Sequence, residues 1–197
     1  LHRRWKKRLV KLADPSEGQR ALDLCCGTGD IAFALAQRGA DVIGIDFSQP
    51  MLDHAAVRNS ESKVTFLHGD ALDTKQPDNH YDLVTIAYGL RNLTSFKGGL
   101  REMHRVAKPG GKLLVLDFGK PSFAPWRWYF FSYLKWTVPW FGRIFCRDAP
   151  AYAYIHESLK NYPAQDGVAE MMRELGCQDI AIHRIFGSAM TINVGVK

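Results

Sequence analysis

The feature that most constrains the fold is a glycine turn set between an apolar run and a helix-forming run. Residues 21–26 are mostly apolar, as expected of a strand covered on both faces of a sheet. Gly27 and Gly29 follow, and without a Cβ they permit positive φ and let backbone N–H groups approach a ligand. Residues 31–37 then predict a helix whose N-terminus offers unpaired donors and a positive dipole end. This order predicts the start of a nucleotide-binding βαβ unit, although a glycine turn alone also occurs without a ligand.

Acidic residues lie within or just after successive predicted strands. Residues 41–46 form a second predicted strand that ends on Asp46, about 20 residues after the turn, where such units hold ribose hydroxyls. Residues 63–68 predict a third strand, and Asp70 lies just beyond it. Ligands in open α/β sheets bind outside the carboxyl ends of strands, so Asp23, Asp46 and Asp70 are expected to converge on one site. The alternative for Asp70 is a cap for the following turn.

The charges around the turn favour one cofactor class over another. The carboxylate of Asp23, inside an apolar strand, is costly unless something pairs with it. The α-amino group of an amino-acid cofactor would pair with it directly or through water. A dinucleotide would instead place a pyrophosphate at the turn, where Asp23 and Asp30 would repel it. The sequence therefore favours S-adenosylmethionine over NAD.

Strands and helices alternate along most of the chain. Ser48 is expected to cap a helix through Val57, and residues 81–87 predict a fourth strand. Residues 94–106 predict a helix, ended by a stop and turn at 108–111, and residues 112–118 predict a fifth strand. Helices at 149–161 and 165–175 precede two antiparallel strands at 178–186 and 191–196. This pattern predicts a single α/β domain over 1–197, with a doubly wound, mostly parallel, seven-stranded sheet.

Composition adds limits on class and partners. The 197 residues are 46% hydrophobic and 12% aromatic, as in a globular chain, and the net charge of +6 suits an anionic surface, either nucleic acid or membrane headgroups. The four cysteines show no CxxC or zinc spacing, so no metal site is predicted. They are interpreted as reduced thiols of a cytoplasmic protein: Cys25, Cys26, Cys146 and Cys177.

Two segments suggest contact with a membrane. Residues 1–12 predict an amphipathic helix with a basic face, which either packs on the sheet or contacts a membrane surface. Residues 123–146 are dense in Trp, Tyr and Phe, but Arg127, Lys135, Pro139 and Arg143 argue against a transmembrane span. This aromatic helical insertion, about 122–163, suits a membrane interface or the wall of a lipophilic pocket; a packed cap is the alternative. We expect a peripherally membrane-associated protein.

Four motifs resemble those of the quinone-biosynthesis C-methyltransferases, the menaquinone and ubiquinone methyltransferase family. They are LDLCCGTGD at 22–30, YGLRN at 88–92, KPGG at 108–111 and LDFGKP at 116–121. The first and third occur in many methyltransferases, whereas the other two are far more specific, and the likeness covers essentially the whole chain. The resemblance implies a class I, Rossmann-like methyltransferase that methylates a ring carbon of a prenylated quinol. The CysCys pair is more similar to the menaquinone branch, which converts demethylmenaquinol to menaquinol.

The resemblance also implies site residues. Cofactor binding is expected at Gly27, Thr28, Gly29, Asp46, Asp70, Ala71 and Ala87. The chain departs from the pattern in two places. Cys25 stands where the common methyltransferase turn has Gly, and we expect close packing there. Ala87 stands where some members have Ser. Members also carry a further N-terminal segment over the active site, and this chain starts at Leu1, after it.

Arg91 and Asn92 are the predicted catalytic residues. The Arg91 guanidinium stays charged and can stabilise a developing phenolate, whereas the alternative is a salt bridge to a nearby carboxylate. Asn92 could orient the ring oxygen. The candidates for accepting the ring proton are Tyr154, His156 and Glu157, with a plain surface position as the alternative for His156.

Other functions stay open. A methyltransferase for a tocopherol precursor or a sterol could have a similar pocket. A basic nucleic-acid-binding module fits the charge, but the aromatic residues cluster in one apolar run without an RNA-binding motif, so no nucleic acid is expected as partner. A Rossmann dehydrogenase would bind NAD instead. The expected partners are a prenylated quinol and a membrane surface, with a homodimer left open.

Overall fold

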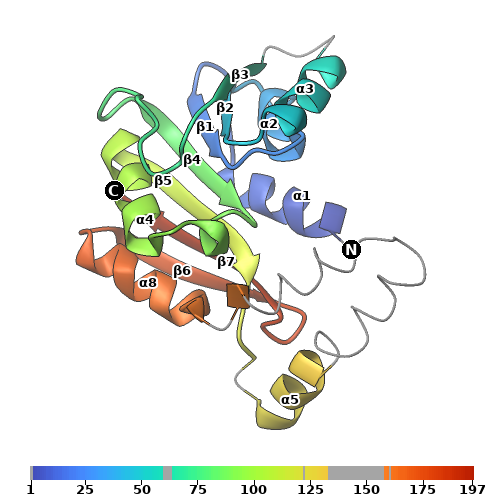
Figure 1. Cartoon of the computed structure of the whole chain (residues 1–197). Coiled ribbons are helices and arrows are strands. Elements are labelled where there is room, and N and C mark those ends of the chain that lie inside the picture. Colours follow the sequence, from blue (N-terminus) through green and yellow to red (C-terminus); the bar gives the residue numbers. More distant parts are fainter. Residues whose placement is uncertain (1, 60–63, 122, 133–157, 160) are drawn as a thin grey trace.

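A twisted sheet with helices on both faces forms the centre of the structure (Figure 1). This computed structural model describes residues 2–59, 64–121, 123–132, 158–159 and 161–197. The expected helix at 149–161 and the aromatic run beyond Ser132 fall largely outside these residues. So do Cys146 and the three candidate proton acceptors at 154, 156 and 157.

The seven strands follow the predicted doubly wound arrangement. Their order in the sheet is β3-β2-β1-β4-β5-β7-β6. The first five strands run parallel to one another, and β7 is antiparallel to both β5 and β6, as the sequence predicts. The bounds are β1 Arg20–Leu24, β2 Asp41–Asp46, β3 Val64–His68, β4 Tyr81–Ala87, β5 Ala107–Phe118, β6 Gln178–Ile185 and β7 Met190–Val196. The first strand therefore ends before the two cysteines that were expected to close it.

Helices cover the two faces of this sheet and enclose two apolar cores (Figure 1). One core packs α1 and α2 against the sheet, and the other packs α4 and α8 against the opposite face. The helices are α1 His2–Ala13, α2 Asp30–Ala36, α3 Gln49–Arg58, η1 Leu90–Asn92, α4 Phe96–Val106, α5 Ala124–Ser132 and α8 Ala164–Glu174. Helices α1, α4 and α8 bury apolar side chains at helical spacing, and this apolar stripe packs each of the three on the sheet.

Helix α1 packs on the sheet through its apolar side. Leu9, Val10 and Ala13 are buried, and the helix contacts both α2 and β5. Lys6 forms an ion pair with Asp30 of α2 at 2.8 Å. The interpretation that residues 1–12 pack on the sheet is therefore confirmed. Contact of this helix with a membrane stays a prediction.

The expected stop and turn at 108–111 is instead a bulge inside a longer strand. Tyr81 pairs with Ala107 and Leu83 with Lys112, so residues 108–111 are accommodated between successive pairs of one ladder. Gly110 has φ +79°, and a Cβ at Gly111 would lie 2.9 Å from the Lys108 carbonyl oxygen. Glycine permits this bulge. The sequence pattern alone predicted the end of one element and the start of another at these residues.

Helix starts differ in how they are capped. Ser95 caps α4, because its hydroxyl accepts a hydrogen bond from the Gly98 N–H at 2.9 Å. Ser48 occupies the N-cap position of α3, but its side chain makes no capping hydrogen bond, contrary to expectation.

Within the described residues, no helix has the length and apolar character needed to cross a bilayer.

Candidate active site at the carboxyl edge of the sheet

A cavity of about 510 Å³ opens at the carboxyl ends of β1, β2 and β4. The strand order reverses between β1 and β4, and this switch point is where open α/β sheets bind ligands. The residues that line the cavity are Cys25, Asp46, Phe47, Asp70, Leu72, Ala87, Tyr88, Gly89, Asn92, Leu93 and Thr94. Apolar surface with a few placed polar groups is typical of a small-molecule site.

Asp46 ties the glycine turn to the end of β2. Its Oδ2 accepts a hydrogen bond from the Gly27 N–H at 2.7 Å, and its Oδ1 accepts one from the Ser48 N–H at 2.8 Å. A carboxylate oxygen can accept more than one hydrogen bond, so both oxygens keep capacity for hydroxyl donors of a ligand. Asp46 is thus held rigidly on the cavity wall by the backbone of two loops.

The turn itself depends on backbone that favours glycine. Gly29 has φ +82°, and a Cβ there would lie 2.7 Å from Cζ of Phe66. Cys25 has φ +51°, which explains why the common methyltransferase turn has Gly at its position. The Cys25 side chain fits because Gly89 faces it, since a Cβ on Gly89 would overlap the Cys25 Cβ. The expected close packing of this cysteine is confirmed.

Asp23 does not lie on the cavity wall, which corrects one expectation. Its side chain is 2% exposed and accepts a hydrogen bond from the Thr85 hydroxyl of β4 at 2.7 Å. Burial raises the pKa of Asp23 from its usual 3.8 to about 7. A hydrogen-bonded carboxyl that is partly protonated at neutral pH needs no cationic ligand to pair with it.

Asp30 is not a free charge at the turn either. It forms ion pairs with Lys6 and with Arg58, each at 2.8 Å. With Asp30 neutralised and Asp23 partly protonated, their repulsion of a pyrophosphate is much weaker than the sequence suggested. The charges of Asp23 and Asp30 therefore do not decide between S-adenosylmethionine and NAD.

The buried Asp23 carboxyl predicts a pH dependence of stability. Its proton binds more tightly in the folded than in the unfolded chain, so the free energy of unfolding falls as pH rises between 3.8 and about 7. Asp23→Asn removes this loss. It should be more stable than the wild type by on the order of 2–4 kcal/mol near pH 8, with a much smaller gain near pH 4, in urea unfolding. Asp41→Asn, an exposed control, should track the wild type at both pH values. An unchanged pH profile in Asp23→Asn would contradict the assignment.

The other predicted cofactor contacts divide into two groups. Asp70 and Ala87 line the cavity with Asp46, and Asp70 Oδ1 also accepts a hydrogen bond from the Leu72 N–H at 2.9 Å, so it caps its turn as well. Four further positions are not among the lining residues: Gly27, Thr28, Gly29 and Ala71. Ala71 is buried in a core cluster, and the Thr28 carbonyl accepts a hydrogen bond from Arg58 at 2.7 Å. Roles for these four stay predictions.

Sequence reasoning missed several apolar residues of the cavity wall. Phe47 is 76% exposed directly after Asp46, and Tyr88 begins the motif that was used only for its arginine and asparagine. Leu72 and Leu93 complete this apolar lining. A large aromatic residue next to a ligand-binding acid is a signal that could have identified Phe47.

The two predicted catalytic residues occupy different environments. Asn92 lines the cavity and donates a hydrogen bond to the Tyr88 carbonyl at 3.3 Å. The Arg91 side chain is instead only 9% exposed. Its Nη1 donates hydrogen bonds to Asp117 Oδ1 at 2.6 Å and to the Tyr88 carbonyl at 2.9 Å. The salt-bridge alternative for Arg91 is thus present in the structure. Its Nε is buried without an acceptor among the described residues, and its catalytic role stays a prediction.

The described residues contain no group of three or more His, Cys, Asp or Glu side chains able to hold a metal ion. Cys25, Cys26 and Cys177 are free thiols.

The sequence matches one protein family over its full length. The profile of the ubiE/COQ5 methyltransferase family covers residues 1–197. A demethylmenaquinone methyltransferase from Anoxybacillus flavithermus is 35% identical, covering 100% of this chain and 85% of the relative. Another protein of that name, from Bacillus subtilis, is 32% identical and covers 100% of this chain and 87% of the relative.

Solved structures agree on the fold. A putative methyltransferase from Haloferax volcanii, in complex with the Trm112 activator, aligns with a TM-score of 0.74 at 18% identity, covering 98% of this chain and 89% of that one. A SAM-dependent methyltransferase from Aquifex aeolicus aligns with a TM-score of 0.65 at 17% identity, covering 97% and 88%. These alignments show that the chain has the fold of these proteins. The full-length profile match and the relatives above 30% identity show that the chain belongs to the ubiE/COQ5 methyltransferase family.

Proposed function

We propose that this methyltransferase transfers a methyl group from S-adenosylmethionine to a ring carbon of a demethylated prenyl quinol, converting demethylmenaquinol to menaquinol. The observation that carries the proposal is the cavity at the switch point with Asp46 on its wall. It lies in a chain that matches relatives named demethylmenaquinone methyltransferase over its full length. Methylation of a demethylated ubiquinone precursor is the nearest alternative.

The cavity residues fit the methyl donor. Asp46 would accept hydrogen bonds from the ribose hydroxyls, since its oxygens keep free acceptor capacity. Phe47 offers an exposed aromatic face at the cavity for the adenine. Asp46 and Asp70 place two carboxylates on the wall, which favours a positively charged ligand. The donor supplies an electrophilic methyl group on a sulfonium.

Alignment and charge stabilisation are the tasks left to the chain. Holding the acceptor carbon in line with the methyl–sulfur bond can supply roughly 7–11 kcal/mol of the barrier. Asn92, on the cavity wall, would orient the ring oxygen, and the guanidinium of the adjacent residue Arg91 would favour the ionised quinol. Among the described residues its Nε has no acceptor, so the guanidinium keeps one donor beyond those that bind Asp117 and Tyr88. The proton released from the ring carbon passes to a base or to water.

We further propose that the protein works at a membrane surface, as a lipophilic acceptor requires. Phe123, just before α5, is 68% exposed, and Trp128, within α5, is 74% exposed. Arg127, between them in sequence, is exposed as well. Aromatic residues beside a cation are typical of the membrane interface. Exposed basic residues of α1 add positive charge: Arg4, Lys7, Arg8 and Lys11. The homodimer stays a prediction.

Turnover with methyl-labelled S-adenosylmethionine tests the substrate. The chain is incubated separately with demethylmenaquinol, a demethylated ubiquinol precursor and a tocopherol precursor, and the labelled lipid is identified by mass. Label should appear in menaquinol at a kcat/KM at least about tenfold above that for either other acceptor. Preferred methylation of one of the other two rings would mean that the proposed acceptor is wrong but that the protein is still a C-methyltransferase. Label in none of the three acceptors would contradict the proposal.

A further inference from the structure

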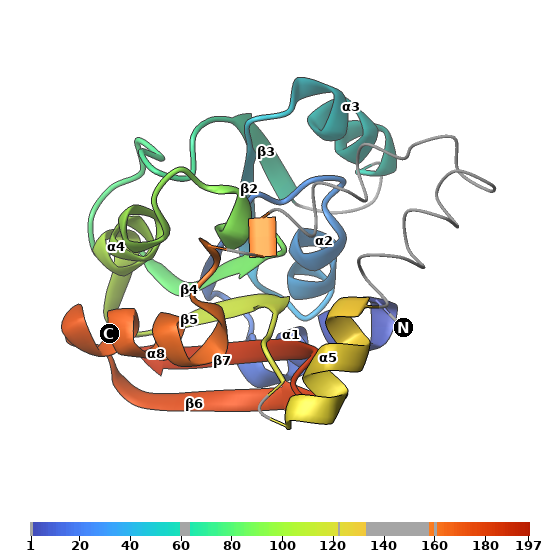
Figure 2. The same ribbon diagram turned by 60° about the horizontal axis from the view of Figure 1, so that its bottom comes forward.

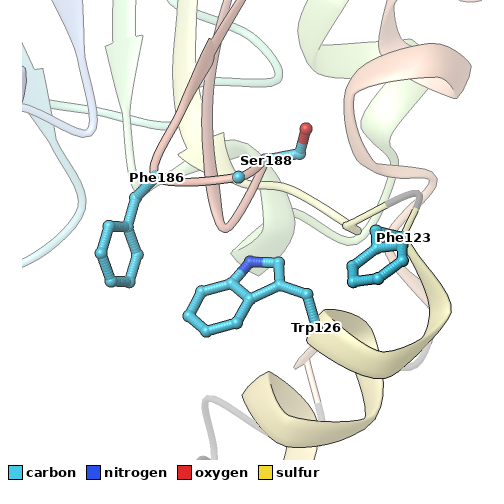
Figure 3. Close-up of a pocket in the computed structure, with 5 residues that line it drawn as sticks. Phe123, Trp126, Phe186 and Ser188 are labelled. Carbon is cyan, nitrogen blue, oxygen red and sulfur yellow. The ribbon is translucent and has the colours of Figure 1, made fainter.

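A second cavity of about 380 Å³ lies between α5 and the turn that joins β6 to β7 (Figure 3). It is lined by Phe123, Trp126, Phe186, Gly187 and Ser188, and we call it the aromatic hollow. The Trp126 ring lies between those of Phe123 and Phe186, and it meets Phe186 edge-on at 5.2 Å between ring centroids. None of these lining residues carries a charge, so the hollow suits an apolar ligand.

The backbone around the aromatic hollow is arranged to admit the indole. Gly187 has φ +61°, and a Cβ there would lie 2.7 Å from Nε1 of Trp126. Any larger residue at this position would therefore push the indole out of place. The Ser188 hydroxyl points away from the three rings (Figure 3). The turn thus presents backbone and aromatic faces, and not a polar side chain, to the cavity.

Two of the three rings are largely in solvent. Phe123 is 68% and Phe186 is 64% exposed. Apolar surface left in water gains free energy when a ligand covers it, and paired aromatic rings offer flat faces to a chain of isoprene units. The exposed rings border a concave hollow, which distinguishes them from apolar residues scattered singly on the surface.

Contacts connect the aromatic hollow to the active-site cavity. Tyr88, on the cavity wall, contacts Phe118 at the end of β5 with ring centroids 6.2 Å apart. The next residue, Gly119, donates a hydrogen bond to the Ala189 carbonyl at 3.1 Å and packs on the Ser188 carbonyl. The chain from residue 118 to 123 spans at most about 18 Å. In both overall views α5 lies beyond the carboxyl end of β5 (Figures 1 and 2), and α5 contributes Trp126 to the hollow.

We propose that the aromatic hollow binds the isoprenoid tail of the acceptor while its ring occupies the active-site cavity. This inference rests on the proposed function for the identity of the ring, but the hollow's preference for an isoprenoid chain stands on its own geometry. Tyr88 contacts Phe118, from which the chain leads to Trp126 and its partner Phe186. The tail then contributes binding energy remote from the reacting carbon.

Kinetics with acceptors of different tail length test the assignment. Phe186→Ala and Trp126→Ala should each raise KM for a long-tailed demethylmenaquinol, presented in detergent micelles, by about tenfold, which is the loss of one aromatic contact. The kcat, and the KM for the same ring bearing a single isoprene unit, should stay within about twofold of wild type. Trp128→Ala is the matched comparison for surface docking, because Trp128 belongs to the proposed membrane contact and is 74% exposed on the same helix but does not line the hollow.

Each other outcome decides against the tail site. Equal losses in Trp128→Ala and Phe186→Ala would mean that this face docks on a lipid surface. Unchanged KM in Phe186→Ala and Trp126→Ala would also overturn the assignment, provided that thermal melting shows both variants folded. Direct binding of a long-chain isoprenoid alcohol, measured by calorimetry, separates the two proposals. Binding weakened by Phe186→Ala but not by Trp128→Ala supports the hollow even if no quinol is methylated, in which case the proposed function alone has failed.

Discussion

Arg91→Ala and Asp117→Ala should each lower the free energy of unfolding by about 3–5 kcal/mol, because each leaves an uncompensated charge in the interior. The Arg91 side chain is 9% and that of Asp117 1% exposed, and the two meet at 2.6 Å. Asp117 also accepts hydrogen bonds from the backbone N–H groups of Phe118 and Arg91. Burial raises the pKa of Asp117 above its ordinary value, and Arg91 opposes that rise.

Urea unfolding of both variants measures this loss, and an exposed ion pair provides the control. Lys97 and Glu174 meet across the surface with side chains 50% and 49% exposed, so Lys97→Ala should cost less than about 1 kcal/mol. The double variant Arg91→Met with Asp117→Leu should recover part of the loss, since it leaves no buried charge. A loss in Arg91→Ala no greater than that in Lys97→Ala would contradict the buried-pair account.

The same arginine variant separates a structural from a catalytic role. The guanidinium also donates to the Tyr88 carbonyl, beside the cavity, and lies 5.0 Å from the Phe118 ring centroid. If Arg91 favours the ionised quinol, Arg91→Ala should lower kcat by at least about a hundredfold while donor binding changes much less. Normal turnover in a folded Arg91→Ala protein would remove this residue from the mechanism.

Asp46→Ala is expected to weaken binding of S-adenosylmethionine by at least about a hundredfold. The change removes the acceptor for ribose hydroxyls, and it also releases the Gly27 and Ser48 N–H groups that fix the turn. Charge-assisted hydrogen bonds are worth about 1.5–3 kcal/mol each, so the loss of two accounts for this factor. Titration calorimetry measures it directly.

Asp53→Ala is the matched control, because Asp53 is an exposed carboxylate on α3 that accepts a hydrogen bond from Gln49. It should leave donor affinity within about twofold of wild type. An Asp46→Ala protein that keeps wild-type affinity would show that the donor lies elsewhere.

The strand and helix alternation was readable from the sequence because its signals are local. Apolar runs of strand length, each followed by a turn, predicted the parallel sheet and the order of strands and helices along the chain. The position of Asp46 at the end of β2 followed from the same pattern and is confirmed on the cavity wall. The close packing of Cys25 was predicted too, although its cause, the facing Gly89, required coordinates.

The features that the sequence did not predict depend on contacts between residues far apart in the chain. Asp23 looked as though it needed a ligand because Thr85, its partner, lies on another strand. The pairing of Arg91 with Asp117 likewise joins two motifs that were interpreted separately. The aromatic hollow combines Trp126 with Phe186, which no periodicity connects. Such pairings follow from the order of strands in space, and a single sequence does not state that order directly.

A crystal structure of this chain with S-adenosylhomocysteine tests the central claim most directly. We expect the nucleoside to occupy the switch-point cavity, with ribose hydroxyls within hydrogen-bonding distance of Asp46 and the adenine against Phe47. A nucleoside bound outside that cavity, or with Asp46 turned away from its ribose, would contradict it.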